Sequence, residues 1–426
     1  MTALGVFVVA YSLVISEEFT HLRKSKPVVL AAGLIWAIIG VEYVMSGHQD
    51  VLHSVVREYL VEFAELFLFL LTAMTYVNSI NERNVFEALR VKLVTKGFSL
   101  KQLFWVTGFI SFFLSALIDN LTTALVMSGV ILAVGKDDKR FISISCVNIV
   151  VAANAGGAFS PFGDITTLMV WQSGQVQFVQ FFSLFLPSVI NYLVPALFMS
   201  LAITDRRLES SDETVRMKTG AKRIMALFGM TIALAISFHQ FLHLPPFMGM
   251  ITGLACLQIF GYFLRRQETL FIRHHAKHMT GDVMPFDSFR EVARAEWDTL
   301  LFFFGVIMSV GGLAFIGYLA HVSGYLYVEL GPTTANVLVG ILSAVIDNIP
   351  VMVAVLHMSP QMDLEQWLLV TLTAGTGGSL LSVGSAAGVA LMGQARGIYS
   401  FFMHLKWLPV IALGYALSIW VHLLIN

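Results

Sequence analysis

Charged side chains are scarce in this sequence. Asp, Glu, Lys and Arg make up 12% of the residues, whereas hydrophobic residues make up 57%, and the mean hydropathy is +0.78. A soluble globular domain carries about 25% charged residues. Many apolar runs approach the roughly 20 residues that cross a bilayer core as a helix. The composition excludes an ordinary soluble protein and predicts a polytopic membrane protein without a nucleic-acid partner.

Cysteine is also scarce, and basic residues are missing ahead of the first apolar run. Cys146 and Cys256 both lie within apolar runs, which argues against a disulfide framework and against a cysteine metal site. The run 3–16 is followed by two glutamates. These flanks do not fit a signal peptide. We therefore expect a first transmembrane helix here and, with no transit peptide in view, a bacterial inner membrane.

The apolar runs predict an all-α fold with about 10–11 spanning helices. Two hydrophilic stretches, 205–223 and 265–298, interrupt them, and the second is the natural divider between two halves. Besides two regions around an Asp-Asn pair, the expected helices are 2–15, 27–45, 60–79, 141–171, 178–204, 224–243, 246–264, 299–320, 367–393 and 401–424.

An Asp-Asn pair stands in the middle of an apolar stretch in each half of the chain. The pattern Ser-Ala-x-Ile-Asp-Asn occurs at 115–120 and again at 343–348. A charge inside a membrane segment costs about 2.5–3.5 kcal/mol on insertion scales, so it indicates a functional site. One such charge per half predicts an internal repeat, with the site where the halves meet.

Two further signals repeat in the same order. An acidic residue precedes each Asp-Asn region, Glu65 in the first half and Asp298 in the second. A glycine pair and a single glycine follow each region, always separated by five residues. These glycines are Gly156, Gly157 and Gly163 in the first half and Gly377, Gly378 and Gly384 in the second. Three ordered matches support the repeat.

The placement of basic residues predicts the topology. If the N-terminus lies outside and each Asp-Asn region is a re-entrant hairpin, all 26 Lys and Arg residues except Arg57 fall on the cytoplasmic side. If residues 103–134 crossed the membrane once, the basic loops beginning at Lys136 and at Arg265 would move outside. For the second region only Arg396 and Lys406 bear on the choice. Both termini are predicted outside, and the halves are then inverted repeats, as in many secondary transporters.

This topology predicts a division of the chain. Residues 1–26 would form an N-terminal helix and loop, and residues 205–245 a connecting loop and helix. The first inverted repeat would span 27–204, with its hairpin at 102–134 and a broken helix at 141–172. The second would span 246–426, with its hairpin at 333–358 and a broken helix at 367–394.

The hairpin tips and the first helix break are rich in oxygen donors. Pro161 lacks an amide hydrogen and clashes with the preceding turn, so the stretch 156–163 cannot continue a helix comfortably. Freed carbonyls at such breaks coordinate small cations, although a Gly-Gly pair can also serve only close helix packing. The candidate ligands are Asp119, Asn120, Asn154, Asp164, Thr166, Thr167, Asp347 and Asn348.

These donors favour a small cation as the ligand. The predicted hairpins and breaks contain no Lys or Arg that would clamp an anion, and a structural salt bridge is therefore the less favoured interpretation of their acids. Hard cations prefer oxygen ligands, and burial favours the protonated form of a carboxylate. Competition between Na⁺ and H⁺ for Asp119, Asp164 and Asp347 would make an exchanger. Glu65 and Asp298 are interpreted equally as helix-end charges or as proton-access groups.

The stretch 154–167 reads Asn-Ala-Gly-Gly-Ala-Phe-Ser-Pro-Phe-Gly-Asp-Ile-Thr-Thr. Together with 115–123, 343–350 and 376–388, it resembles the NhaD-type sodium/proton antiporters. These belong to an ion transporter superfamily with arsenite and dicarboxylate carriers. The resemblance covers about residues 65–393 and implies exchange of Na⁺ or Li⁺ for H⁺, without a cofactor, through the eight candidate ligands.

The resemblance implies three further features. Ser382 and Ser385 match the serine-rich second break of the family and join the candidate site. Relatives are dimers in which a transport domain moves against a scaffold, which implies a homodimer here. Asn78 is a departure, because the family commonly carries a glutamate at this place in the third helix.

Two other functions compete with the cation exchanger. A sodium-coupled anion or dicarboxylate carrier of the same superfamily would have a similar fold, but two fixed negative charges at the tips would repel a dianion. An intramembrane enzyme is disfavoured, because no Ser/His or metal-ligating His pairing repeats at one depth. We therefore predict a transporter rather than an enzyme.

Overall fold

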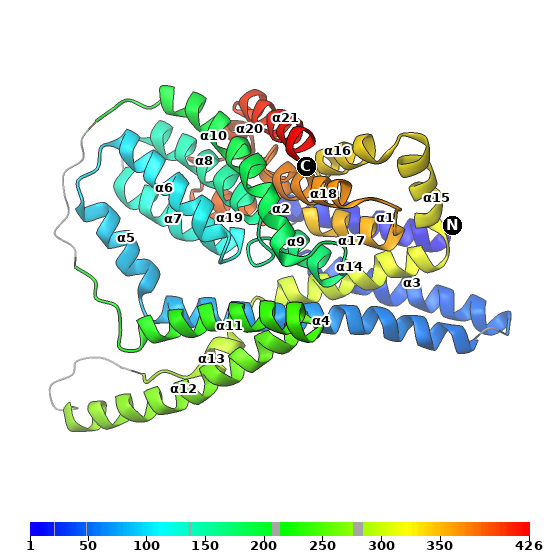
Figure 1. Cartoon of the computed structure of the whole chain (residues 1–426), viewed down its shortest axis with the longest axis horizontal. Helices are drawn as coiled ribbons and strands as arrows, with labels where there is room; N and C mark the ends of the chain where they lie inside the picture. Colours follow the sequence, from blue (N-terminus) through cyan, green and yellow to red (C-terminus); the bar gives the residue numbers. More distant parts are fainter. Residues whose placement is uncertain (21, 48, 136–137, 207–213, 276–283) are drawn as a thin grey trace. The chain divides into compact units, whose positions relative to one another are not determined.

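A computed structural model describes the chain except residues 21, 48, 136–137, 207–213 and 276–283 (Figure 1). All regular structure in the described part is helical. Eight of the helical segments described there are long and apolar enough to cross a bilayer. They are α3 (Ser25–Met45), α4 (Gln49–Glu82), α8 (Lys139–Ala158), η1 (Phe178–Leu184) with α10 (Phe185–Leu201), α11 (Ala221–Leu242), α12 (Pro246–His275), α14 (Trp297–Phe315) and α21 (Leu408–Ile425).

Shorter helices complete the fold. Five are apolar: α1 (Thr2–Ile15), α6 (Leu100–Ser115), α7 (Asn120–Gly135), α16 (Pro332–Ser343) and α17 (Asn348–Met358). The others are α2 (Glu17–Thr20), α5 (Val85–Thr95), α9 (Ile165–Gln172), α13 (Ser288–Ala293), α15 (Tyr318–Ser323), η3 (Gly324–Glu329), α18 (Leu364–Gly377), η4 (Ser382–Gly384), α19 (Ala386–Gln394) and α20 (Phe401–Leu405). The predicted all-α polytopic membrane fold is confirmed.

Most predicted helix positions agree with the structure, with four local differences. Helix α12 (Pro246–His275) continues beyond the predicted 246–264 into the hydrophilic stretch. Helix α4 has 34 residues, longer than the predicted 60–79. Helix α14 ends at Phe315 because Gly317 adopts φ +87°, so the predicted 299–320 splits into α14 and α15. The last predicted helix likewise divides into α20 and α21, with Pro409 in the first turn of α21.

The chain divides into two compact units. Unit 1 contains residues 1–56, 90–213 and 305–426, and unit 2 contains residues 57–89 and 214–304. Both Asp-Asn motifs and both glycine clusters therefore belong to unit 1, whereas Glu65, Asn78 and Asp298 belong to unit 2. The predicted repeat boundaries, 27–204 and 246–426, follow the sequence motifs and remain a prediction.

Helix α8 is the centre of unit 1. Every residue from Phe141 to Ala158 is buried, because α6, α7, α10, α18 and α19 all pack against it. Its second half, Val150–Ala158, is built mostly from small side chains, which let neighbouring backbones come close. A helix enclosed in this way can carry polar groups away from lipid.

The two Asp-Asn motifs form equivalent helical pairs in unit 1. Helices α6 and α7 contact one another and pack on α8, while α16 and α17 contact one another and pack on α18 (Figure 1). The first serine of each motif donates to a carbonyl of the packed helix. Ser115 Oγ lies 2.6 Å from Ala153 O, and Ser343 Oγ lies 2.8 Å from Ala374 O. The shared six-residue pattern thus produces the same local packing twice.

The repeated glycines also make equivalent contacts. A side chain at Gly156 would strike the carbonyl oxygen of Phe112, and one at Gly377 would strike that of Gly340. Each glycine therefore lets a helix of the break lie against the first helix of its hairpin. The single glycines repeat this contact at the ends of the same helices, Gly163 at Ser115 and Gly384 at Ser343 and Ala344.

Unit 2 is held together by buried polar contacts. Tyr76 on α4 donates its hydroxyl to Gly253 O on α12 at 2.7 Å and accepts from Thr231 on α11 at 2.9 Å. Arg83 is only 1% exposed and binds Glu82 as well as Glu268, whose Oε1 lies 2.6 Å from Arg83 Nη1. Breaking a buried pair of this kind leaves an uncompensated charge.

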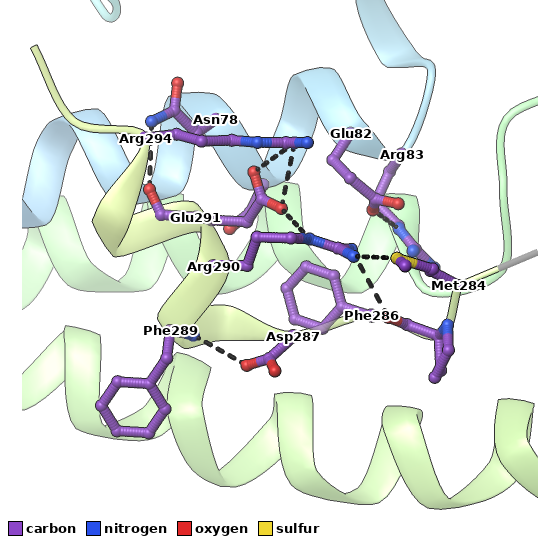
Figure 2. Close-up of polar contacts among 12 residues, drawn as sticks. Asn78, Glu82, Arg83, Met284, Phe286, Asp287, Phe289, Arg290, Glu291 and Arg294 are labelled. Carbon is purple, nitrogen blue, oxygen red and sulfur yellow. Dashed lines mark hydrogen bonds and ion pairs between the residues drawn. The ribbon is translucent and has the colours of Figure 1, made fainter.

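A second ionic cluster in unit 2 lies on α13 (Figure 2). The carboxylate of Glu291 is fully buried and accepts from Arg290 at 3.3 Å and from Arg294 at 3.1–3.2 Å. Asn78 on α4 donates its amide to Glu291 O at 3.1 Å. The first cluster pairs charges between the end of α4 and α12, whereas the second pairs charges within α13 and is joined to α4 by the Asn78 amide.

Candidate functional site

Asp164 lies at the break between α8 and α9. Helix α8 ends at Ala158, and the chain turns through Pro161 and Gly163 before α9 begins. The Asp164 carboxylate caps α9 by accepting from Thr166 N at 3.0 Å, and Asp164 is 5% exposed. An N-cap aspartate is common at the surface, but here both the acid and the capped turn are buried.

The tip of the second hairpin meets Asp164. Asn348 Nδ2 lies 3.3 Å from Asp164 Oδ1 and 3.2 Å from Oδ2, although the two residues are 184 positions apart. Gly375 on α18 faces the same carboxylate, since a Cβ there would lie 3.2 Å from Oδ2. The structure thus brings the tip of the second helical pair to the first helix break at this contact.

The tip of the first hairpin meets a neutral partner instead. Asn120 Nδ2 donates to Asn154 Oδ1 at 3.0 Å, and Asn154 Nδ2 donates to Ser385 Oγ at 3.0 Å. Ser385 caps α19 in the second break, as Asp164 caps α9 in the first. These three side chains form a continuous hydrogen-bonded chain from the first tip through α8 to the second break.

Asp119 is held within its own hairpin. Its Oδ1 accepts from Thr122 N at 2.7 Å, and its Oδ2 accepts from the Thr122 hydroxyl at 2.8 Å. Both carboxylate oxygens are therefore engaged by one residue of α7. Among the described residues, no three acids or other metal-ligating side chains gather in one group, so Asp119, Asp164 and Asp347 do not form a common cluster.

Asp347 lacks this local partner. Pro350 stands three residues after Asp347, where Thr122 follows Asp119, and it has neither an amide hydrogen nor a hydroxyl. Lys24 contacts the acid instead, with its Nζ 2.6 Å from Asp347 Oδ2. The expectation that these acids lack a basic partner was wrong for Asp347, because a residue before α3 reaches the tip.

The neighbouring polar groups are buried. Oδ1 of Asp347 has no hydrogen-bond partner in the part of the chain that the structure describes. Thr166 is fully buried at the first turn of α9, and the Thr167 hydroxyl donates to Ala158 O at 3.3 Å across the break. Ser382 is buried in the second break, where its hydroxyl lies 3.3 Å from Met392 Sδ. Carboxylate, hydroxyl and carbonyl oxygens thus concentrate at the Asp164 break.

The predicted proton-access residues belong to unit 2, and their contacts do not test that role. Glu65 lies on α4 and Asp298 on the first turn of α14, and both are partly buried. Their role in proton access remains a prediction. At the departure from the family pattern, the Asn78 amide donates to a backbone carbonyl, a contact that an ionised glutamate cannot make because it has no donor.

Comparison with known proteins settles the family. The model of the citrate transporter family matches residues 1–375. The chain is 57% identical to the Na⁺/H⁺ antiporter NhaD of Vibrio cholerae over all of this chain and 91% of that protein. It is 55% identical to the protein of the same name in Halomonas elongata, over all of this chain and 88% of that protein. The chain belongs to the NhaD-type sodium/proton antiporter family.

A more distant relative extends the same picture. Sodium/proton antiporter 1 of Arabidopsis thaliana is 33% identical over 99% of this chain and 72% of that protein. The predicted resemblance to NhaD-type antiporters is therefore confirmed over the whole chain. Membership also agrees with a polytopic transporter whose broken helices carry buried oxygen donors.

Three residues at the site were missed by the sequence analysis. Thr122 and Pro350 could have been found by comparing the two motifs beyond their shared six residues. Lys24 carries no such signal, because a basic residue before a transmembrane helix usually lies in a solvated loop.

Proposed function

We propose that this NhaD-type protein exchanges Na⁺ or Li⁺ for H⁺ by alternating access. The observation that carries the proposal is the contact of the Asn348 amide with both carboxylate oxygens of Asp164. It joins a hairpin tip to a helix break of the other half around a buried acid. The relatives named Na⁺/H⁺ antiporter, at 55–57% identity over the full chain, support the choice of ions.

The chemistry of the site suits competition between Na⁺ and H⁺. We place Na⁺ at the Asp164 break and the adjoining Asp347 tip, where Thr166 and freed backbone carbonyls add neutral oxygens. A buried carboxylate that has lost Na⁺ is a costly charge, and a proton neutralises it. Asp164 therefore holds Na⁺ or a proton at any one time, and their exchange couples the two fluxes.

The remaining candidate residues shape the site in this proposal. Asn348 orients Asp164. Asn120, Asn154 and Ser385 form a neutral hydrogen-bonded chain between the first tip and the second break. Thr167 and Ser382 fix the two breaks. Asp119, whose oxygens are engaged by Thr122, stabilises the first tip and is a weaker candidate ligand.

Alternating access follows from the repeat. The equivalent serine and glycine contacts of the two halves support two inverted repeats that move around a shared site. Two inverted repeats can rock against one another around the shared site, which opens it first to one side of the membrane and then to the other. The homodimer implied by the family resemblance would supply a scaffold for this movement, and crosslinking in membranes tests it.

A transport assay tests the function directly. Inverted vesicles containing the protein would be loaded with an acid-sensitive dye and energised to build a pH gradient. We expect NaCl and LiCl to restore fluorescence. The size of the response to NaCl, LiCl and KCl ranks the three cations. Vesicles without the protein are the control. No response to any cation over a wide pH range, together with uptake of citrate or a dicarboxylate, would favour the sodium-coupled anion carrier.

Labelling of single cysteines tests the topology and the inner-membrane location. In a background without Cys146 and Cys256, we expect an impermeant thiol reagent added to intact bacteria to modify Arg57→Cys but not Lys139→Cys. Both native positions are exposed on the protein. Lys136, part of the same predicted cytoplasmic loop as Lys139, lies outside the described residues. Labelling of Lys139→Cys from outside would contradict the first re-entrant hairpin.

A further inference from the structure

The segment before α3 supplies a cation to the tip of the second hairpin. Lys24 Nζ lies 2.6 Å from Asp347 Oδ2, and the two side chains are only 20% and 15% exposed. Arg23, also before α3, and Lys26, in the first turn of α3, are both exposed. Lys24 is thus distinguished from its basic neighbours by its direction toward the candidate ion site.

Asp347 keeps an oxygen that a cation other than the Lys24 ammonium can bind. Oδ1 of Asp347 and the hydroxyl of Tyr11 are buried, and within the described residues neither has a hydrogen-bond partner. The charge of Asp347 acts on Tyr11, which places the hydroxyl within its electrostatic reach. Pro350 adds no donor at the tip. A carboxylate oxygen that is buried beside an ion pair and accepts no hydrogen bond is free to bind a cation, which a closed structural pair would not leave available.

We propose that the Lys24 ammonium is a tethered cation that competes with Na⁺ for Asp347 and thereby sets the apparent affinity for Na⁺. This inference rests on the proposed function, because it names a residue that tunes the same site. When Na⁺ binds at Asp347, the ammonium leaves, and when Na⁺ departs, it returns.

Competition by a tethered cation has a physical advantage. A carboxylate left without a partner in a low-dielectric site is strongly unfavourable. Exchange of one monovalent cation for another keeps the charge at Asp347 balanced in both states. The tether also makes release of Na⁺ easier, since the replacement is always at high local concentration. Lys24 therefore lowers the affinity for Na⁺ while keeping the empty site stable.

The test compares three variants in proteoliposomes at one fixed pH. In Lys24→Met the competitor is gone, and we expect the apparent KM for Na⁺ to fall about ten-fold, the effect of losing one partly buried charge. Lys24→Arg keeps a cation and should stay within about three-fold of the parent protein. Lys26→Met removes the same charge from an exposed neighbouring position and should leave the KM unchanged.

Stability in Na⁺ gives a readout that a structural ion pair would not move. Without Na⁺, Lys24→Met should unfold at a lower temperature than the parent protein, because Asp347 is left unpaired. Saturating NaCl should recover most of that loss, whereas choline chloride should not. A structural pair predicts the same loss of stability with and without Na⁺ and an unchanged KM.

The unmodified protein provides a test that needs no variant. We expect NaCl, relative to choline chloride, to increase the reaction of Lys24 with an amine-modifying reagent, measured by mass spectrometry with Lys26 as the internal reference. Unchanged reactivity of Lys24, or an unchanged or higher KM in Lys24→Met, overturns the inference while Na⁺/H⁺ exchange by the parent protein stands. Loss of exchange in the parent protein itself would instead remove the proposed function.

Discussion

The two hairpin tips share a six-residue motif but handle their acidic residue differently. At the first tip, Thr122 donates both its amide and its hydroxyl to Asp119. At the second tip, Pro350 stands at the equivalent position and donates nothing, so Asp347 meets Lys24 instead. The residue three positions after the acid, outside the shared motif, decides whether the carboxylate oxygens accept hydrogen bonds from their own helix or stay available to a cation. Equal sequence signals therefore do not imply equal ion sites.

The two breaks differ in the same sense. Asp164 follows Gly163 in the first break, whereas Ser385 follows Gly384 in the second, and both cap the next helix. The first break thus carries a charge that a cation can neutralise. At the second break, Ser385 belongs to a chain of neutral side chains with Asn154 and Asn120 that satisfy one another. The two breaks therefore keep the same capping role but differ in charge.

The largest expected effect separates the two breaks. We expect Asp164→Asn to reduce Na⁺-driven exchange by about 100-fold or more, since the buried charge that competes for Na⁺ and H⁺ is lost. Ser385→Ala removes only a neutral hydroxyl and should retain most activity. Dye fluorescence in proteoliposomes measures both, with size-exclusion profiles showing that each variant folds. Normal exchange by a folded Asp164→Asn protein would contradict the proposed mechanism.

The next effect separates the two tips. Asp347→Asn should lower kcat/KM for Na⁺ by about 30-fold, because the acid that faces Lys24 is the one available to the ion. Asp119→Asn should lower it by less than about five-fold, since the amide oxygen of Asn can still accept from Thr122 N and cap the helix. Initial rates over a range of NaCl concentrations measure the difference. An equal loss of kcat/KM in Asp347→Asn and Asp119→Asn would show that the structural difference between the two tips does not affect Na⁺ exchange.

How far the sequence reaches depends on the range of each interaction. The hairpins and the first break were predictable because Asp-Asn, Gly-Gly and Pro161 act on their own neighbours in the chain. The ion pair of Lys24 with Asp347 joins residues 323 positions apart, and no local pattern marks it. The sequence likewise predicts Arg83 in a cytoplasmic loop and does not reveal its burial, because Glu268 reaches it only when α4 and α12 pack.

A substitution at Pro350 should make the second tip resemble the first. In Pro350→Thr an amide and a hydroxyl become available to Asp347, and we expect the apparent KM for Na⁺ to rise about five-fold as these donors compete with the ion. Pro350→Ala restores only the amide and should give a smaller increase. The comparison uses Na⁺ titrations of exchange at one pH. A KM that does not change in either variant would mean that Asp347 is not part of the Na⁺ site.

The smallest expected effect concerns the space beside the Asp164 carboxylate. A methyl group at Gly375 would lie 3.2 Å from Asp164 Oδ2 and 3.4 Å from Ala158 Cβ, closer than the carboxylate can easily tolerate. We expect Gly375→Ala to raise the KM for Na⁺ about three-fold while leaving the protein folded. Gly393→Ala is the matched control, because it is also helical but has open space around it, and it should leave the KM unchanged. Counted from the glycine pairs, Asn154 stands at the position equivalent to Gly375. Gly375 leaves room beside the Asp164 carboxylate, whereas the Asn154 amide fills the equivalent place near Ser385. Equal KM values in both glycine variants would argue that Na⁺ does not use the space beside Asp164.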